Sequence, residues 1–241
     1  VGVSAAIKQK YGIEVVPHMI CGGQSKYDIE DALIDLDFLG IQNVLALRGD
    51  AMPGTSRFVA EKDGHAHAEQ LVEQIINMNN GRFIDGEPDT RHNTDFCVGV
   101  AGYPEKHVES PNYLTDLGYL KQKVDAGAEY IATQICYDTD KIIAFRDKCS
   151  EIGINVPILP GLKPFASKTQ LTVLPQTFAV DLPQELVDRV VQCKNNDDVK
   201  KVGVEWAIKQ GEKLQKAGFP VLHFYTMTRT EQVQQIIKEL I

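Results

Sequence analysis

Residues 96–107 read FCVGVAGYPEKH, an apolar run that is followed at once by polar and aromatic side chains. The run is apolar at nearly every position, as expected of a parallel strand that is covered on both faces. In barrels built from such strands, the residues just after each strand carry the chemistry. The stretch therefore predicts a buried strand over Phe96–Ala101 and places Gly102–His107 at a functional rim.

The same pattern recurs along the chain, with each apolar run followed by a segment of helical periodicity. This alternation predicts either a doubly wound sheet or a (β/α)8 TIM barrel. No Gly-x-Gly-x-x-Gly follows a run, which favours the barrel. The other five predicted strands are Glu14–Val16, Asn43–Leu47, Tyr130–Ala132, Val156–Leu159 and Val221–Phe224.

Six strands cannot close an eight-stranded barrel. We therefore expect the first two strands upstream of residue 1, and residues 1–241 to form a single catalytic barrel domain that is incomplete at its N-terminus. The sequence also predicts where several helices begin and end. We expect a helix over Asp28–Leu39 that stops at Gly40, and helices capped by Thr115 and Thr139.

Composition excludes several classes of function. The 241 residues include 33 acidic and 25 basic side chains, and no basic stripe of the kind that nucleic acid requires. No apolar run approaches the roughly 18 residues of a membrane span. The five cysteines are widely spaced without a CxxC pair, which predicts free thiols in the cytoplasm. His65 and His67 lack a third ligand nearby, so we expect no metal site.

Polar residues follow the other predicted strands too, and each has a purely structural alternative. His18 could simply be hydrogen-bonded within the fold, and Arg48 could pair with Asp50. Gln134 ends an apolar strand, where an unpaired buried amide would cost about 1–3 kcal/mol. It needs a partner, and a ligand is one candidate.

Five motifs in order resemble the catalytic barrel of the methylenetetrahydrofolate reductase family, from about Val15 to the C-terminus. They are Leu47-Arg48-Gly49-Asp50, Ala101-Gly102-Tyr103-Pro104-Glu105 with His107, Lys123-Val124-Asp125-Ala126-Gly127-Ala128, Thr133-Gln134 and His223-Phe224-Tyr225-Thr226.

The resemblance implies FAD as the cofactor, bound at the C-terminal rim of the barrel. Arg48 and Lys123 supply the cations that its pyrophosphate needs in an acidic protein. The full set of FAD contacts implied by the resemblance is His18, Arg48, Gly49, Asp50, Ala68, Tyr103, His107, Asp116 and Lys123.

The implied reaction has two halves at one site. NADH or NADPH transfers a hydride to flavin N5, and 5,10-methylenetetrahydrofolate then receives it to give 5-methyltetrahydrofolate, a step of one-carbon metabolism and methionine biosynthesis. The resemblance assigns catalytic roles to Asp50, which holds the pterin, and to Gln134, which contacts pterin and nicotinamide in turn. It implies folate contacts for Gln170, Tyr225 and Arg229, the last suited to a glutamate carboxylate.

Family members also carry a general-acid glutamate on the first barrel strand, which we expect upstream of Val1. The resemblance is to the short bacterial form, without a regulatory domain, and implies a homo-oligomer. Two other interpretations stay open: another flavin barrel oxidoreductase, such as a proline dehydrogenase-like enzyme, and a non-catalytic barrel that binds folate or serves as a scaffold. The choice between NADH and NADPH is open as well.

Overall fold

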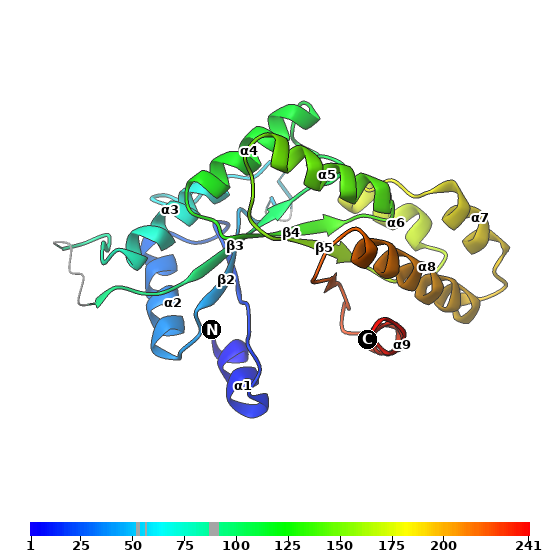
Figure 1. Cartoon of the computed structure of the whole chain (residues 1–241). Coiled ribbons are helices and arrows are strands. Elements are labelled where there is room, and N and C mark those ends of the chain that lie inside the picture. The colour runs from blue at the N-terminus through cyan, green and yellow to red at the C-terminus, as the bar shows by residue number, and fades with distance from the viewer. Residues whose placement is uncertain (52–53, 56, 87–91) are drawn as a thin grey trace. The chain divides into compact units, whose positions relative to one another are not determined.

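A computed structural model describes residues 1–51, 54–55, 57–86 and 92–241, with strands and helices alternating along most of the chain (Figure 1). The strands are β1 (His18–Ile20), β2 (Asn43–Leu47), β3 (Cys97–Gly102), β4 (Tyr130–Ile135), β5 (Ile158–Leu162) and β6 (His223–Phe224). The helices are α1 (Gly2–Tyr11), α2 (Lys26–Phe38), α3 (Ala68–Asn79), α4 (Tyr113–Asp125), α5 (Thr139–Glu151), α6 (Gln170–Phe178), α7 (Gln184–Gln192), α8 (Asn196–Lys216) and α9 (Glu231–Leu240).

The strands follow one another in the sheet in chain order, β1-β2-β3-β4-β5-β6. Pairing is parallel: His18 is opposite Leu45 in β2, and Gly161 is opposite His223 at the other end of the sheet. A doubly wound sheet reverses its strand order at a switch point, whereas a (β/α)8 barrel keeps it sequential. The predicted α/β fold class with six parallel strands is confirmed.

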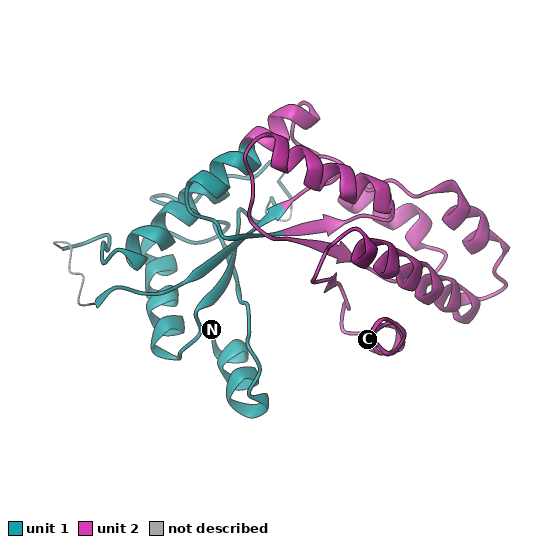
Figure 2. Ribbon diagram, viewed as in Figure 1, with its two compact units in different colours: residues 1–101, 119–131 teal, residues 102–118, 132–241 magenta. Residues whose placement is uncertain are grey.

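Two compact units make up the chain (Figure 2): residues 1–101 with 119–131, and residues 102–118 with 132–241. In the first unit, α2 buries Ile29, Leu33 and Leu36 completely. Their spacing of four and three residues puts them on one helical face. α3 buries Leu71 and Ile75 by the same rule.

The second unit has a core of apolar side chains. Two hydrogen bonds join α8 to the residues that follow β4. Trp206 donates its indole N–H to the Tyr137 carbonyl at 3.2 Å, and Gln210 donates to the Cys136 carbonyl at 3.1 Å. Gly203 lets α8 approach the chain after β5, because a Cβ there would lie 2.1 Å from the Phe165 carbonyl oxygen.

Several predicted boundaries were wrong. The first strand is His18–Ile20, not Glu14–Val16, because pairing with β2 starts only at the Pro17 carbonyl, which accepts from the Leu45 N–H at 3.0 Å. β4 runs three residues further than predicted, so Gln134 lies inside the strand.

Among the helices, α4 begins at Tyr113 rather than near Thr115. Asn112 caps it, accepting the Thr115 N–H at 2.9 Å. The end of α2 before Gly40 is confirmed, with a glycine φ of 69°. Thr139 is the first residue of α5, but Asp138 rather than Thr139 caps the helix, accepting the Asp140 N–H at 2.9 Å. No helix within the described ranges is long and apolar enough to cross a membrane.

The close approach of α8 predicts a large loss of stability for Gly203→Ala, because the new methyl group overlaps backbone that cannot move aside. We expect a loss of about 1–3 kcal/mol in the free energy of unfolding, measured by urea denaturation. Gly118→Ala in α4 is the control. Nothing lies within 4 Å of its Cβ, so it should gain about 0.5–1 kcal/mol from helix propensity. Equal effects of the two substitutions would contradict the packing described.

Candidate functional site

In the first unit, the loops after β1 and β2 are hydrogen-bonded together. The Cys21 N–H donates to the Leu47 and Arg48 carbonyls at 3.1 Å, and the Gly22 N–H to the Arg48 carbonyl at 3.1 Å. Gly49 has a φ of 86°, a conformation that L side chains rarely adopt. These bonds and that turn fix where the chain leaves β2 and place Asp50 in solvent.

The Arg48 guanidinium lies over the Phe58 ring, 5.0 Å from its centroid. This stacking keeps a permanent cation beside the end of β2. The same ring packs against the loop after β1, since a Cβ at Gly22 would lie in van der Waals contact with it, 3.4 Å from a Phe58 ring carbon.

Three other predicted cofactor residues lie in this unit. Ala68 is the first residue of α3, so it stands at the partly positive N-terminus of that helix. Lys123 of α4 donates from Nζ to the Ala101 carbonyl at 2.5 Å, which puts its charge at the end of β3. His18 opens β1 and is exposed, rather than following a strand as predicted.

In the second unit, the loop after β3 is folded around the buried carboxylate of Asp116. Oδ1 accepts from the Ser110 hydroxyl at 2.6 Å, and Oδ2 accepts the His107 N–H at 3.2 Å. The Tyr103 and His107 rings then meet edge to face, with centroids 4.7 Å apart. Three residues predicted to bind one cofactor therefore lie together, with Asp116 holding the loop in place.

Glu105, in the same loop, makes contacts that the sequence did not predict. Its carboxylate accepts from Lys141 Nζ at 2.6 Å and from the Asp181 N–H at 3.1 Å. Lys141 also pairs with Asp181 at 2.8 Å. The loop is thus joined to α5 and to the segment after α6. Burial disfavours the charge of Lys141, but the two carboxylates outweigh it and raise its pKa.

Gln134 lies half-buried in β4, and its Oε1 accepts the N–H of Ile135 at 2.8 Å. Next to it, the Thr133 carbonyl accepts from the Tyr225 hydroxyl at 2.9 Å. Burial raises the pKa of Tyr225, so its phenol stays protonated and donates. Gln134 and Tyr225, both predicted to contact substrate, therefore lie near each other at the end of β4.

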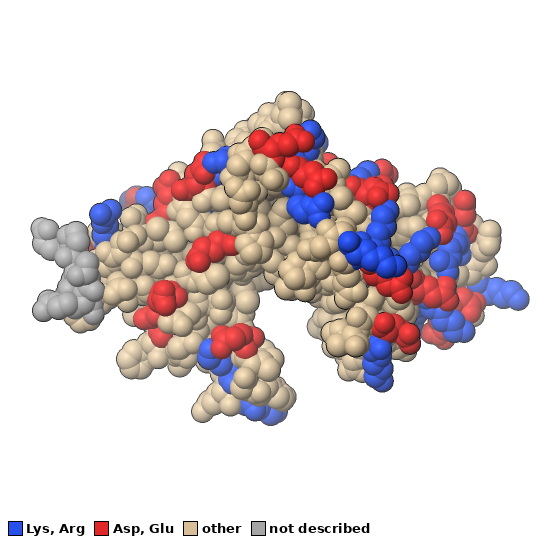
Figure 3. Space-filling view, viewed as in Figure 1, with Lys and Arg blue, Asp and Glu red and all other residues tan. Residues whose placement is uncertain are grey.

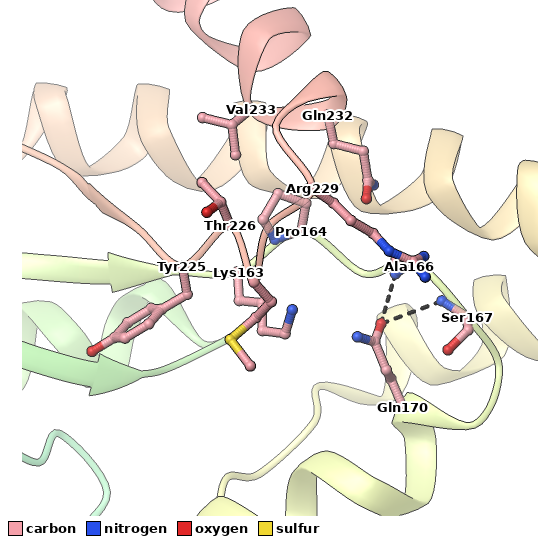
Figure 4. A pocket seen from close by; sticks show the side chains of 11 residues that line it. Lys163, Pro164, Ala166, Ser167, Gln170, Tyr225, Thr226, Arg229, Gln232 and Val233 are labelled. Carbon is pink, nitrogen blue, oxygen red and sulfur yellow. Dashed lines mark hydrogen bonds between the residues drawn. The ribbon is translucent and has the colours of Figure 1, made fainter. Parts of the chain in front are cut away.

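A pocket of about 180 Å³ opens where β5 and β6 end (Figure 4). Gln170, Tyr225 and Arg229, all predicted to contact substrate, line it together with Lys163. Gln170 Oε1 accepts the Ala166 and Ser167 N–H groups at 2.6 and 3.3 Å, which turns its amide nitrogen to other partners. Sequence reasoning missed Lys163, although its place directly after β5 was a usable signal.

His65, one of the two neighbouring histidines, has a side-chain partner within the fold. His65 is buried, and its Nε2 lies 2.6 Å from Gln74 Oε1. No group of three or more His, Cys, Asp or Glu side chains suited to a metal occurs in the described part of the chain. On the face drawn in Figure 3, acidic and basic side chains are interspersed.

The amino-acid sequence is similar to those of known proteins along its whole length. The family model described as "Methylenetetrahydrofolate reductase" matches residues 1–241. Relatives include methylenetetrahydrofolate reductase 1 of Schizosaccharomyces pombe, 34% identical over 99% of this chain, and 5,10-methylenetetrahydrofolate reductase of Salmonella typhimurium, 30% identical over 99%. The chain spans 38% of the length of the first relative and 74% of the second.

Among solved structures, a protein from Clostridium thermocellum that binds two copies of 5-methyl-5,6,7,8-tetrahydrofolic acid is similar in fold. Its TM-score is 0.54 at 14% identity, over 97% of this chain and 75% of that one. A 2,3-dimethylmalate lyase has a TM-score of 0.53 at 10% identity, over 98% and 61%. At these identities the likeness concerns the fold.

The burial of His65 predicts a pH-dependent contribution to stability. Burial lowers the pKa of His65 below 6.5, with Lys26 acting in the same direction and the Gln74 bond opposing it. A lowered pKa in the folded state means that the contribution is present above the unfolded pKa of about 6.5 and is lost as the pH falls through the folded pKa. Between pH 7 and 5, the wild type should therefore lose more free energy of unfolding than His65→Gln. Exposed His18, changed to Gln, is the control, and parallel curves for wild type and His65→Gln would contradict the prediction.

Proposed function

Because the chain belongs to the methylenetetrahydrofolate reductase family, we propose that it is the catalytic barrel of an enzyme that reduces 5,10-methylenetetrahydrofolate to 5-methyltetrahydrofolate. FAD is its cofactor, and NADH or NADPH is the hydride donor. The observation that carries the proposal is the family match over residues 1–241. Within each unit, polar side chains that follow the strands support it. Residues 1–241 act as one catalytic domain, in a cytoplasmic homo-oligomer that serves one-carbon metabolism and methionine biosynthesis.

The donor groups of the first unit fit FAD. Arg48, Lys123 and the N-terminus of α3 at Ala68 are the positive groups that a pyrophosphate needs. Gln24, in the loop after β1, has a buried side-chain oxygen without a hydrogen-bond partner in the described structure. A ligand hydroxyl is a suitable donor to it, since an unpaired buried acceptor costs free energy.

When bound, FAD supplies the redox chemistry by taking up a hydride from NAD(P)H and giving it to the folate. The chain's own residues bind, orient and exclude water. Arg48 and Lys123 hold the phosphates. The edge-to-face pair of Tyr103 and His107, held by Asp116, offers an apolar ring surface with polar edges. His18 and the Gly49 backbone complete the cofactor contacts.

Asp50 and Gln134 orient the reacting groups. Asp50 is exposed just beyond the Gly49 turn, where its carboxylate can accept from the N–H groups of a pterin. The Gln134 amide, fixed by the Ile135 N–H, can donate to the pterin in one half-reaction and to the nicotinamide in the other. Gln170, Tyr225 and Arg229 receive the rest of the folate.

The test is an anaerobic titration of the full-length natural protein, loaded with FAD and followed by visible absorption. NADH or NADPH should bleach the flavin bands, and 5,10-methylenetetrahydrofolate should restore them. Bleaching without recovery on folate would favour another flavin barrel oxidoreductase. A protein that takes up no FAD would contradict the proposal and leave a binding or scaffold role.

Gln134→Leu sharpens this test, because leucine keeps the size and removes the amide. We expect both half-reactions to slow by about 10- to 100-fold, equivalent to the loss of one hydrogen bond of about 1.5–3 kcal/mol. Gln192→Leu, exposed at the end of α7, is the matched control and should leave both rates unchanged. Unaltered rates in Gln134→Leu would remove that residue from the mechanism.

A further inference from the structure

The pocket where β5 and β6 end contains two cations and no acidic group. Lys163, half-buried, follows β5 directly, and Arg229 belongs to the segment between β6 and α9 (Figure 4). Neither side chain has a hydrogen-bond or ion-pair partner within the described ranges. The remaining residues that line the pocket are neutral, among them Gln170 and Gln232.

This arrangement differs from that of three other cations in the second unit, each of which pairs with a carboxylate. Lys141 pairs with Glu105 and Asp181, Arg189 with Glu205, and Lys213 with Asp140. The chain carries a net charge of −8, so carboxylates are plentiful. Lys163 and Arg229 nevertheless lie together without a carboxylate beside them, and this points to an anionic ligand.

Two amide side chains contribute to the pocket wall in opposite ways. Gln170 uses its side-chain oxygen on the Ala166 and Ser167 N–H groups and so presents its NH2. Gln232 donates to the Phe165 and Lys200 carbonyls at 2.8 and 3.1 Å, which fixes that side of the wall and leaves its side-chain oxygen as an acceptor. The two cations and the Gln170 amide together make the pocket suited to oxygen atoms that accept hydrogen bonds.

The backbone that carries Arg229 is strained. Met227 and Thr228 have φ values of 47° and 66°, a left-handed backbone conformation that is unfavourable for residues other than glycine. The Arg229 N–H closes the turn on the Thr226 carbonyl at 2.9 Å. The fold thus holds a costly turn that sets the position of the guanidinium.

The size of the pocket limits what it can hold. At about 180 Å³ it is smaller than the roughly 300–1,000 Å³ that encloses a whole drug-sized ligand. It therefore takes one end of a larger molecule. Two cations and an amide donor fit an end that carries two carboxylates.

We propose that Lys163 is a specificity-determining residue that, with Arg229, binds the two carboxylates at the far end of the substrate. This inference rests on the proposed function, since the glutamate end of a folate is such a dicarboxylate. Arg229 binds one carboxylate through its planar fork, and Lys163 binds the other as a point charge. Burial and the charge of Arg229 lower the pKa of Lys163, so a bound dianion also relieves the repulsion between the two cations.

The experiment compares two ligands in the full-length protein. 5-Methyltetrahydrofolate carries the glutamate, and 5-methyltetrahydropteroate lacks it. We expect Lys163→Met to weaken binding of the first by about 10-fold, the loss of one partly exposed charged hydrogen bond, and to change binding of the second less than about 2-fold. Lys163→Arg should keep most of the affinity. Lys238→Met, exposed on α9, is the control.

Steady-state kinetics give a second readout. Lys163→Met should raise KM for the folate and leave kcat unchanged, because the contact is equal in ground and transition states. An equal loss of affinity for both ligands, or no loss for the glutamate form, would overturn the role of Lys163.

A failure of the proposed function can be told apart from a failure of this inference. If the wild type binds neither folate nor pteroate, a titration with glutarate, followed by NMR, tests whether the pocket binds a dicarboxylate. Glutarate binding that is lost in Lys163→Met would support the dicarboxylate site, and no glutarate binding to the wild type would overturn it.

Discussion

Parallel strand pairing places the polar residues of this chain. In a parallel sheet every strand ends at the same edge, so the residues that follow successive strands face a common side. The order β1 to β6 is sequential, and each described pairing between neighbours is in register and parallel. Arg48 after β2, Tyr103 after β3 and Lys163 after β5 owe their positions to this constraint.

Within that frame, internal polar contacts hold the loops in shape. The Asp116 carboxylate fixes the loop after β3, and Glu105 joins the same loop to Lys141 and the Asp181 backbone. Such bonds contribute only about 0.5–3 kcal/mol each, yet they keep side chains oriented before a ligand arrives. A site prepared in this way loses less conformational entropy on binding.

Sequence patterns predicted the fold class and most of its elements, because buried parallel strands and capped helices leave local signals. Asn43–Leu47 was predicted with both ends correct. The first strand was misplaced. Which residues form it depends on their pairing with β2, and the local sequence does not show that pairing. Lys163 was not assigned a role from the sequence, because the pocket that it shares with Arg229 depends on a contact between residues remote in sequence. The internal partners of Asp116 and Glu105 are equally non-local.

The central claim is that the rim of the strands binds a flavin next to a folate. A crystal structure of the full-length protein with FAD and 5-methyltetrahydrofolate tests it most directly. The account predicts FAD in contact with Arg48, Tyr103 and Lys123, the pterin against Asp50 and Gln134, and the glutamate in the pocket of Lys163 and Arg229. A flavin bound away from the C-terminal ends of the strands would contradict it.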